Sequence, residues 1–175
     1  MKTLNQYIKE KLIINQRFDE KLIINKDYHD NMIVVKSFDE LGNIIEDRYD
    51  KLGAGTEQYP IDFNDIDVSN LDSFCNENNG KGIFEETKFK YIDISDWDVS
   101  NVESMNSMFY MCDELKSVGD ISSWDVSNVT VMQFMFYGCE SFNQDISGWD
   151  VSNVMYKYHM FYNCPIKDEY KPKFK

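Results

Sequence analysis

Apolar and polar residues recur in one fixed frame through the second half of the chain. The frame is Asp-Ile-Ser-x-Trp-Asp-Val-Ser-Asn-Val, and it occurs at 93–102, 120–129 and 145–154. Each copy is followed by Met-Phe-Tyr, at 108–110, 135–137 and 160–162, and then by a cysteine, at 112, 139 and 164. An earlier Asp-Val-Ser-Asn lies at 67–70. The chain therefore contains a tandem array of about four units of roughly 25 residues.

Apolar residues follow two different spacings within a unit, one after the other. Trp97 and Val99 alternate with polar residues, which predicts a short extended segment. From Val102 to Cys112 the apolar residues follow at steps of three and four, which predicts one or two helical turns. Ser and Asn are favoured N-cap residues, so we expect Ser100-Asn101 to start the helical part.

A unit of this size cannot bury enough apolar surface to fold alone. Its core side chains contribute roughly 10–15 kcal/mol at about 1.5–3 kcal/mol each, while ordering its backbone costs about 25–50 kcal/mol. Neighbouring units must therefore share a core and hydrogen bonds, which predicts an α/β solenoid. The last unit is atypical, as a terminal unit should be, because Lys157 replaces a core methionine and Pro165 follows Cys164.

The first third of the chain follows a different pattern. Residues 1–55 hold 9 basic and 10 acidic residues, whereas residues 56–165 hold 5 and 19, which indicates a boundary near Gly53-Ala54-Gly55. We expect a small α+β cap or docking segment at 1–55, the repeats at 56–165 and a polar tail at 166–175. Expected elements are an amphipathic helix at 4–12 and a hairpin in which Met32–Val35 and Asn43–Glu46 are joined by a turn at Leu41-Gly42-Asn43. The sequence Glu-Lys-Leu-Ile-Ile-Asn also occurs twice, at 10–15 and 20–25.

Charge and hydropathy narrow the function classes. The formal net charge of -13 argues against a protein that tracks nucleic-acid phosphates. No apolar run is long enough to span a membrane, and the first residues show no secretory signal. His29 and His159 are the only histidines, and no Gly-rich phosphate loop is present. We therefore expect no catalysis and no cofactor.

The repeated frame with its Met-Phe-Tyr-x-Cys resembles the BspA-like leucine-rich-repeat surface proteins, whose repeat domain also occurs in surface lipoproteins of mycoplasmas. The resemblance covers about residues 66–165 and is most specific in the last three units. It implies a short leucine-rich-repeat-like stack with a strand and a helical segment per turn. It also implies adhesion or protein binding at bacterial surfaces, although no signal peptide or anchor is seen in this sequence.

Equivalent positions of stacked units form rows, and two rows are candidates for partner binding. The Tyr row is Tyr110, Tyr137 and Tyr162, and it follows the core phenylalanine of each unit. Tyrosine combines a large contact area with a polar tip and is common in binding hot spots. The alternative is an aromatic ladder that only joins the units. The Asp row is Asp98, Asp125 and Asp150, whose carboxylates cap backbone N–H groups, bind calcium or contact a partner.

Two further rows have structural interpretations. Cys112, Cys139 and Cys164 close an apolar face, which favours buried reduced thiols over disulfides or a metal site. Asn101, Asn128 and Asn153 should satisfy backbone groups of the neighbouring unit.

The sequence as a whole predicts a non-enzymatic protein-recognition or adhesion module that binds a protein partner or a surface glycan. The alternative is a structural or cargo component of a larger assembly, such as a phage particle, docked through its N-terminal segment.

Overall fold

The computed structural model describes residues 32–174. It contains four two-residue strands, one α-helix and one 3-10 helix: β1 (Ile33–Val34), α2 (Phe38–Leu52), β2 (Ile61–Asp62), β3 (Ile66–Asp67), β4 (Ile92–Asp93) and η1 (Asp168–Tyr170). Residues 33–175 form one compact unit, which includes both α2 and the repeats. The expected helix at 4–12 and the duplicated segments at 10–15 and 20–25 lie outside the described residues.

The helix α2 replaces the hairpin that the sequence predicted, so that prediction is wrong. Ser37 caps the helix by accepting a hydrogen bond from the Glu40 N–H, and two acidic residues occupy the first turn. Leu41 and Ile45 are buried at a spacing of four residues. The burial of one helical face outweighs the preference of the aliphatic residues in 43–46 for a β-strand. The helix ends at Gly53, whose φ of 74° favours glycine.

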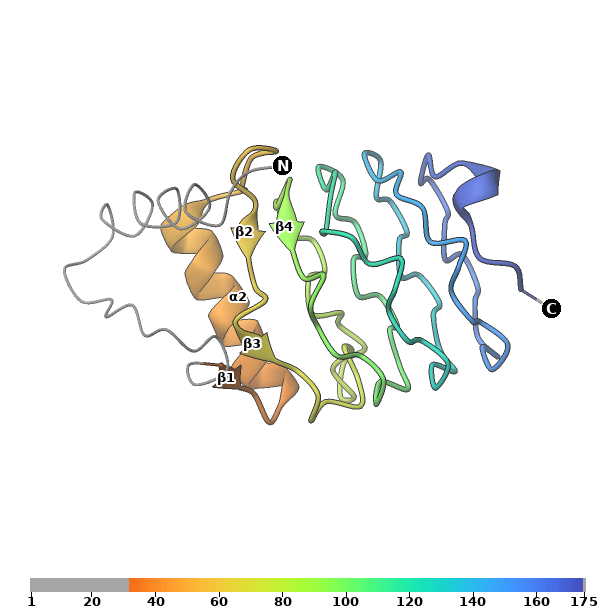
Figure 1. The fold of residues 1–175 in the computed structure, drawn as a ribbon, viewed down its shortest axis with the longest axis horizontal. Coiled ribbons are helices and arrows are strands. Elements are labelled where there is room, and N and C mark those ends of the chain that lie inside the picture. The colour runs from red at the N-terminus through yellow and green to blue at the C-terminus, as the bar shows by residue number, and fades with distance from the viewer. Residues whose placement is uncertain (1–31, 175) are drawn as a thin grey trace. The chain divides into compact units, whose positions relative to one another are not determined.

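Successive repeats lie side by side and are joined at equivalent positions (Figure 1). The strand β1 pairs in parallel with β3, and β2 pairs in parallel with β4. A third series of parallel bridges joins Ser104 to Val131 and Val131 to Tyr156. Backbone hydrogen bonds continue this pairing, for example from the Phe109 N–H to the Met135 C=O at 2.9 Å. The units therefore depend on their neighbours for their backbone hydrogen bonds.

Tight turns replace the helical segments expected in the repeats, so that this second prediction is also wrong. Bonds of the i→i+3 type close the turns, as from the Tyr110 N–H to the Ser107 C=O at 2.9 Å. A positive φ recurs at two positions of the unit, and these backbones cannot continue a right-handed helix. One position is Ser107 (56°), Phe134 (58°) and His159 (52°), and the other is Met111 (57°), Gly138 (71°) and Asn163 (55°).

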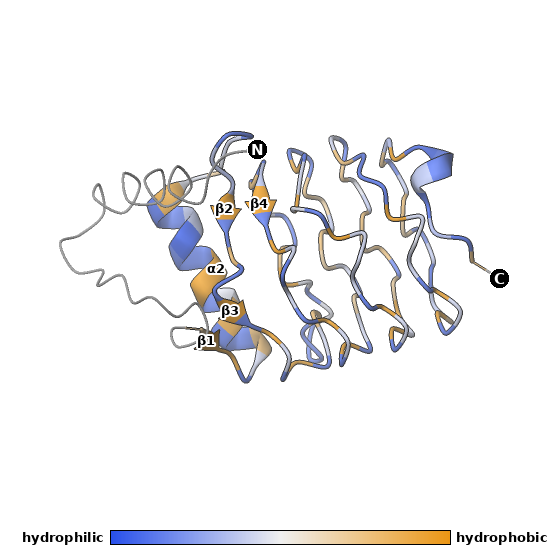
Figure 2. Cartoon of the chain, viewed as in Figure 1, coloured by the Kyte–Doolittle hydropathy of each residue, from blue (hydrophilic) through white to orange (hydrophobic). Residues whose placement is uncertain are grey.

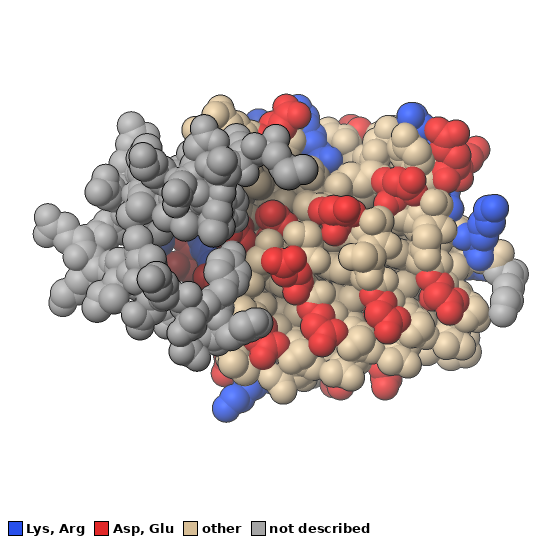
Figure 3. Space-filling model, in the orientation of Figure 1, with Lys and Arg blue, Asp and Glu red and all other residues tan. Residues whose placement is uncertain are grey.

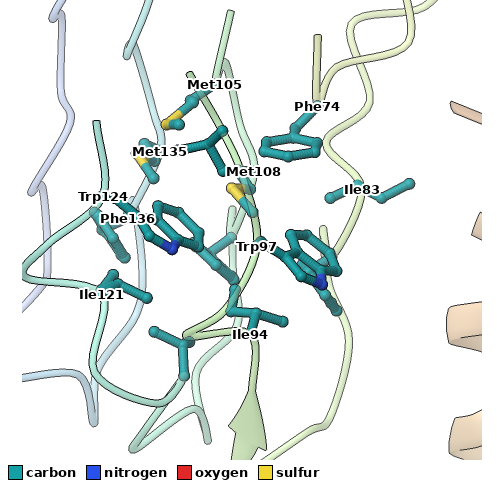
Figure 4. Close-up of a cluster of buried hydrophobic side chains, with 14 of the residues drawn as sticks. Phe74, Ile83, Ile94, Trp97, Met105, Met108, Ile121, Trp124, Met135 and Phe136 are labelled. Atoms are coloured by element: carbon teal, nitrogen blue, oxygen red, sulfur yellow. The ribbon is translucent and has the colours of Figure 1, made fainter. Parts of the chain in front are cut away.

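The core runs through the repeats as rows of like side chains. Figure 2 shows apolar segments recurring from one repeat to the next, and Figure 4 shows side chains of neighbouring repeats packed together, among them Trp97 and Trp124. The rings of Trp124 and Trp149 stack at 6.2 Å between centroids, and those of Phe109 and Phe136 stack at 5.3 Å. The tryptophans thus align from repeat to repeat, as the sequence frame predicted.

Residues 166–174 cover the core at the C-terminal end. Ile166 is buried, and Tyr170 and Phe174 pack partly buried against the core. The Ile146 N–H donates to the Tyr170 C=O at 3.0 Å, so the tail also joins the last repeat through its backbone. None of the helices in residues 32–174 combines the length and the apolar character that a membrane span requires.

Candidate functional site

The Tyr row forms a continuous stack of rings. Tyr137 stacks on Tyr110 and on Tyr162, with ring centroids 5.0 Å apart in both pairs. Tyr110 and Tyr137 are half-buried, and Tyr162 is 54% exposed. Because neighbouring rings cover both faces of Tyr137, this ring presents its edge, and Tyr162 is the last ring of the stack. The two interpretations of this row are therefore compatible, since the rings join the repeats and also remain accessible.

Three further rings enlarge this surface, and the sequence did not single them out. Phe134 contacts Tyr110, Tyr137 and Tyr158 edge to face. His159 lies 3.7 Å from Tyr158 and 5.1 Å from Tyr162 between ring centroids. His159 is exposed. We call the Tyr row with Phe134, Tyr158 and His159 the aromatic surface. The sequence contains one signal for these additional rings, which is that Phe134 and His159 occupy the same position of their units.

The Asp row binds backbone within its own repeat. The carboxylates of Asp98, Asp125 and Asp150 accept hydrogen bonds from the N–H groups of Ser100, Ser127 and Ser152 at 3.0–3.1 Å. Asp98 also accepts from the Ser100 hydroxyl at 2.7 Å. These bonds confirm the structural interpretation of the row, in which carboxylates satisfy N–H groups. The three carboxylates are exposed. Figure 3 shows acidic side chains arranged in rows across one face of the repeats.

Hydrogen bonding to Ser100 should set the titration of Asp98. The hydroxyl and N–H of Ser100 hold the pKa of Asp98 below its usual value, because they stabilise the carboxylate. A pKa lowered by folding contributes stability above the unfolded pKa of about 3.9, and this is lost as the pH falls through the folded pKa. In Ser100→Ala, the pKa of Asp98 should rise toward the ordinary value in a carboxyl NMR titration. Asp120, held by Ser122, should be unaffected and serves as the control. An unchanged Asp98 midpoint would contradict this assignment.

Comparison with known proteins places the repeats in a family. Residues 78–169 match the family described as "Mycoplasma protein of unknown function, DUF285". The chain belongs to the DUF285 family. No curated protein and no solved structure matches the chain. The DUF285 match covers the three specific repeats with their Tyr row, and it assigns no function to them.

The cysteines of the DUF285 repeats are free thiols that face the core. The Cys112 thiol lies 2.9 Å from the Phe84 C=O, and the Cys139 thiol lies 3.0 Å from the Phe109 C=O. Both side chains are buried, whereas Cys164 and Cys75 are half-buried. Burial raises the pKa of Cys112 to about 12 and also raises the pKa of Cys139. Buried reduced thiols are thus confirmed for Cys112 and Cys139.

Alkylation should separate these thiols. At pH 8, iodoacetamide should modify Cys75 and Cys164 well before Cys112, because the Cys112 thiol is buried and protonated. A mass-spectrometric time course on folded protein measures the order, and the same reagent on denatured protein is the control in which all sites react alike. Modification of Cys112 as fast as Cys75 in folded protein would contradict the packing described here.

The Asn row of the DUF285 repeats has the structural role that the sequence predicted. The side-chain amides of Asn101, Asn128 and Asn153 donate to the backbone C=O of Ser69, Ser100 and Ser127 in the preceding repeat, at 2.7–2.9 Å. This confirms that the row satisfies backbone groups of the neighbouring unit. In residues 32–174 no three His, Cys, Asp or Glu side chains lie close enough to hold a metal ion.

Proposed function

We propose that this chain is a non-enzymatic protein-recognition module, built as a short leucine-rich-repeat-like solenoid, and that the aromatic surface contacts the partner. The observation that carries the proposal is the stack of Tyr110, Tyr137 and Tyr162 outside the core, with further rings beside it. Adhesion at a bacterial surface, which the BspA-like resemblance implies, belongs to this proposal.

Two features of the aromatic surface support a protein partner over a glycan. Sugars pack on the faces of aromatic rings, but both faces of the central ring, Tyr137, are covered by Tyr110 and Tyr162 at 5.0 Å. Ring edges and hydroxyls suit the mixed apolar and polar contacts of a protein interface. The rings are also fixed by stacking, so that little side-chain entropy is lost on binding.

The Asp row adds a charged surface to the proposal. Residues 56–165 hold 5 basic and 19 acidic residues, which favours encounter with a basic protein. Asp98, Asp125 and Asp150 each bind a serine of their own repeat, so their carboxylates are held in place while exposed.

A binding screen with matched variants tests the proposal. Wild-type protein is screened on arrays of bacterial surface proteins, host extracellular proteins and glycans, and the positive ligands are titrated against Tyr137→Ala. Loss of a central hot-spot residue should weaken protein binding at least about tenfold. Tyr59→Ala is the control, because Tyr59 is 44% exposed but lies outside the aromatic surface. Equal affinity of Tyr137→Ala and wild-type protein would reject this surface, and binding only to glycans would reject the protein partner.

The alternative function, a structural or cargo component of an assembly, depends on the N-terminal segment. Residues 1–31 of that segment lie outside the described residues, so the alternative stays a prediction of the sequence. Fusing residues 1–30 to a reporter tests it, since a docking segment should carry the reporter into particles.

A further inference from the structure

A cavity lies on the side of the repeats where β2 and β4 pair (Figure 1). The starts of four successive repeats line it, and its lining includes Glu57, Tyr91, Asp93, Lys116, Gly119 and Gln144. Its volume is about 380 Å³, near the lower end of the range for small-molecule pockets. We call it the lateral cavity. Its size suits a ligand no larger than an amino acid.

The lateral cavity lies where one repeat is longer than the next. Seven residues separate Cys112 from Asp120, whereas five separate the equivalent Cys139 and Asp145. Extra residues in one unit of a repeat array form a loop on one face, and that face is often the binding face. The longer repeat thus places an irregular surface on this side of the array.

Hydrogen bonds hold the longer segment and give the lateral cavity a fixed wall. The Gln144 Oε1 accepts from the Val118 N–H at 2.9 Å, and the Gln144 Nε2 donates to the Gly119 C=O at 2.8 Å. Gly119 has a φ of 82° and lies so close to Asp93 that a Cβ would be 2.4 Å from the Asp93 Oδ1. The wall is therefore ordered before a ligand binds, which lowers the entropic cost of binding.

The lateral cavity contains a lysine that no carboxylate neutralises within residues 32–174. Lys90 pairs with Glu114 at 2.9 Å, one turn away. Lys116 instead lies 5.8 Å from the centroid of the Tyr91 ring and makes no ion pair in the described part of the chain. An ammonium group in this position is available to a carboxylate of a ligand.

A carboxylate of the lateral cavity is likewise available. Glu57 is exposed and has neither an ion pair nor a side-chain hydrogen bond among residues 32–174. Asp93, the other acidic residue of the lining, accepts hydrogen bonds from the N–H and the hydroxyl of Ser95 at 3.1 and 2.7 Å. Glu57 is therefore the carboxylate that can bind an ammonium group of a ligand.

We propose that the lateral cavity binds a small zwitterion, a free amino acid. The carboxylate of the ligand pairs with Lys116, its ammonium group pairs with Glu57, and its side chain contacts Pro60 and Tyr91. A ligand with only one charge would leave either Lys116 or Glu57 without a partner, so charge complementarity favours the zwitterion. This inference is independent of the proposed function, because the lateral cavity shares no residue with the aromatic surface.

Amide NMR titration of the full chain tests the proposal. The probes are the standard free amino acids, each added singly to millimolar concentration. At least one should shift the resonances of Ser117, Gly119 and the Gln144 side chain along a saturable curve. The N-acetyl and the carboxamide derivatives of that amino acid each lack one charge. Each should bind about three- to fivefold more weakly, which is the effect of losing one exposed ion pair.

Variants assign each charge of the ligand to its partner. In Lys116→Met, the preference for the free amino acid over its carboxamide should disappear, because the carboxylate has lost its partner. In Glu57→Gln, the preference over the N-acetyl derivative should disappear for the corresponding reason. Lys81→Met is the control, because Lys81 is exposed and lies outside the lateral cavity, and it should keep both preferences.

The contrary outcomes are distinct from failure of the proposed function. Absence of shifts with every amino acid, or shifts confined to residues outside the lateral cavity, would overturn the proposal. Equal binding of a derivative that lacks one charge would overturn it in favour of a simple cation or anion. Tyr137→Ala should leave amino-acid binding unchanged even where it abolishes binding of a protein partner.

Discussion

Replacing Phe136 by alanine should lower the free energy of unfolding by about 3–5 kcal/mol. The Phe136 side chain is fully buried, and its ring stacks on Phe109, Phe142 and Phe161 with centroids 5.3, 4.4 and 5.9 Å away. Alanine would leave a cavity between repeats as well as remove apolar contacts. The cavity and the lost contacts both weaken a core that neighbouring repeats build together.

Chemical denaturation measures the effect, with Tyr156→Ala as the matched control. Tyr156 belongs to the same array but is 58% exposed, so its loss should change the free energy of unfolding by less than about 0.5 kcal/mol. Similar destabilisation by the two substitutions would show that the phenylalanine stack does not hold the repeats together.

Gly82→Ala should be the second strongly destabilising change, at about 3 kcal/mol or more. A Cβ at Gly82 would lie 1.9 Å from the Ser107 carbonyl oxygen and 2.8 Å from the Met108 nitrogen. The clash is with backbone, so it can be relieved only by moving the neighbouring repeat. That movement would disturb the hydrogen bond from the Phe84 N–H to the Met108 C=O.

A second glycine provides the control for Gly82. A Cβ at Gly148 meets nothing closer than the Ser122 carbonyl oxygen at 3.8 Å, which is ordinary contact. Gly148→Ala should therefore leave the thermal midpoint within a degree or two, about 0.5 kcal/mol or less. A thermal midpoint of Gly82→Ala equal to that of wild-type protein would contradict the close approach of these two repeats.

The sequence frame predicted which residues lie next to one another across repeats. The tryptophan, phenylalanine and tyrosine rows stack, and the Asn row bonds to the preceding repeat. These relations follow from repetition, because identical units that pack side by side must place identical residues together. The class of solenoid stays a prediction.

Local backbone conformation was not predictable in the same way. Steps of three and four apolar residues from Val102 to Cys112 fit a helix and a series of tight turns equally well. The deciding feature is the positive φ at Ser107 and Met111, which neither residue type indicates. The helix α2 was missed because its Ile44-Ile45 pair and Gly42 suggest a hairpin, whereas burial of Leu41 and Ile45 decides the outcome.

The candidate site was predicted in part. Tyr110, Tyr137 and Tyr162 were found because they repeat. The sequence did not point to Phe134, Tyr158 and His159. A search for rows favours positions that hold the same residue type in every repeat, and at these positions the residue type varies.

Disulfide crosslinking tests most directly whether the repeats stack in register. Val131 and Tyr156 are bridge partners in adjacent repeats, and adjacent strands lie about 4.8 Å apart, within the span that a disulfide requires. Val131→Cys with Tyr156→Cys should therefore form a linked peptide under mild oxidation, detected by mass spectrometry. Ser104→Cys with Tyr156→Cys, two repeats apart, should not. Linkage of the second pair as readily as the first, or of neither pair, would contradict the stacked arrangement.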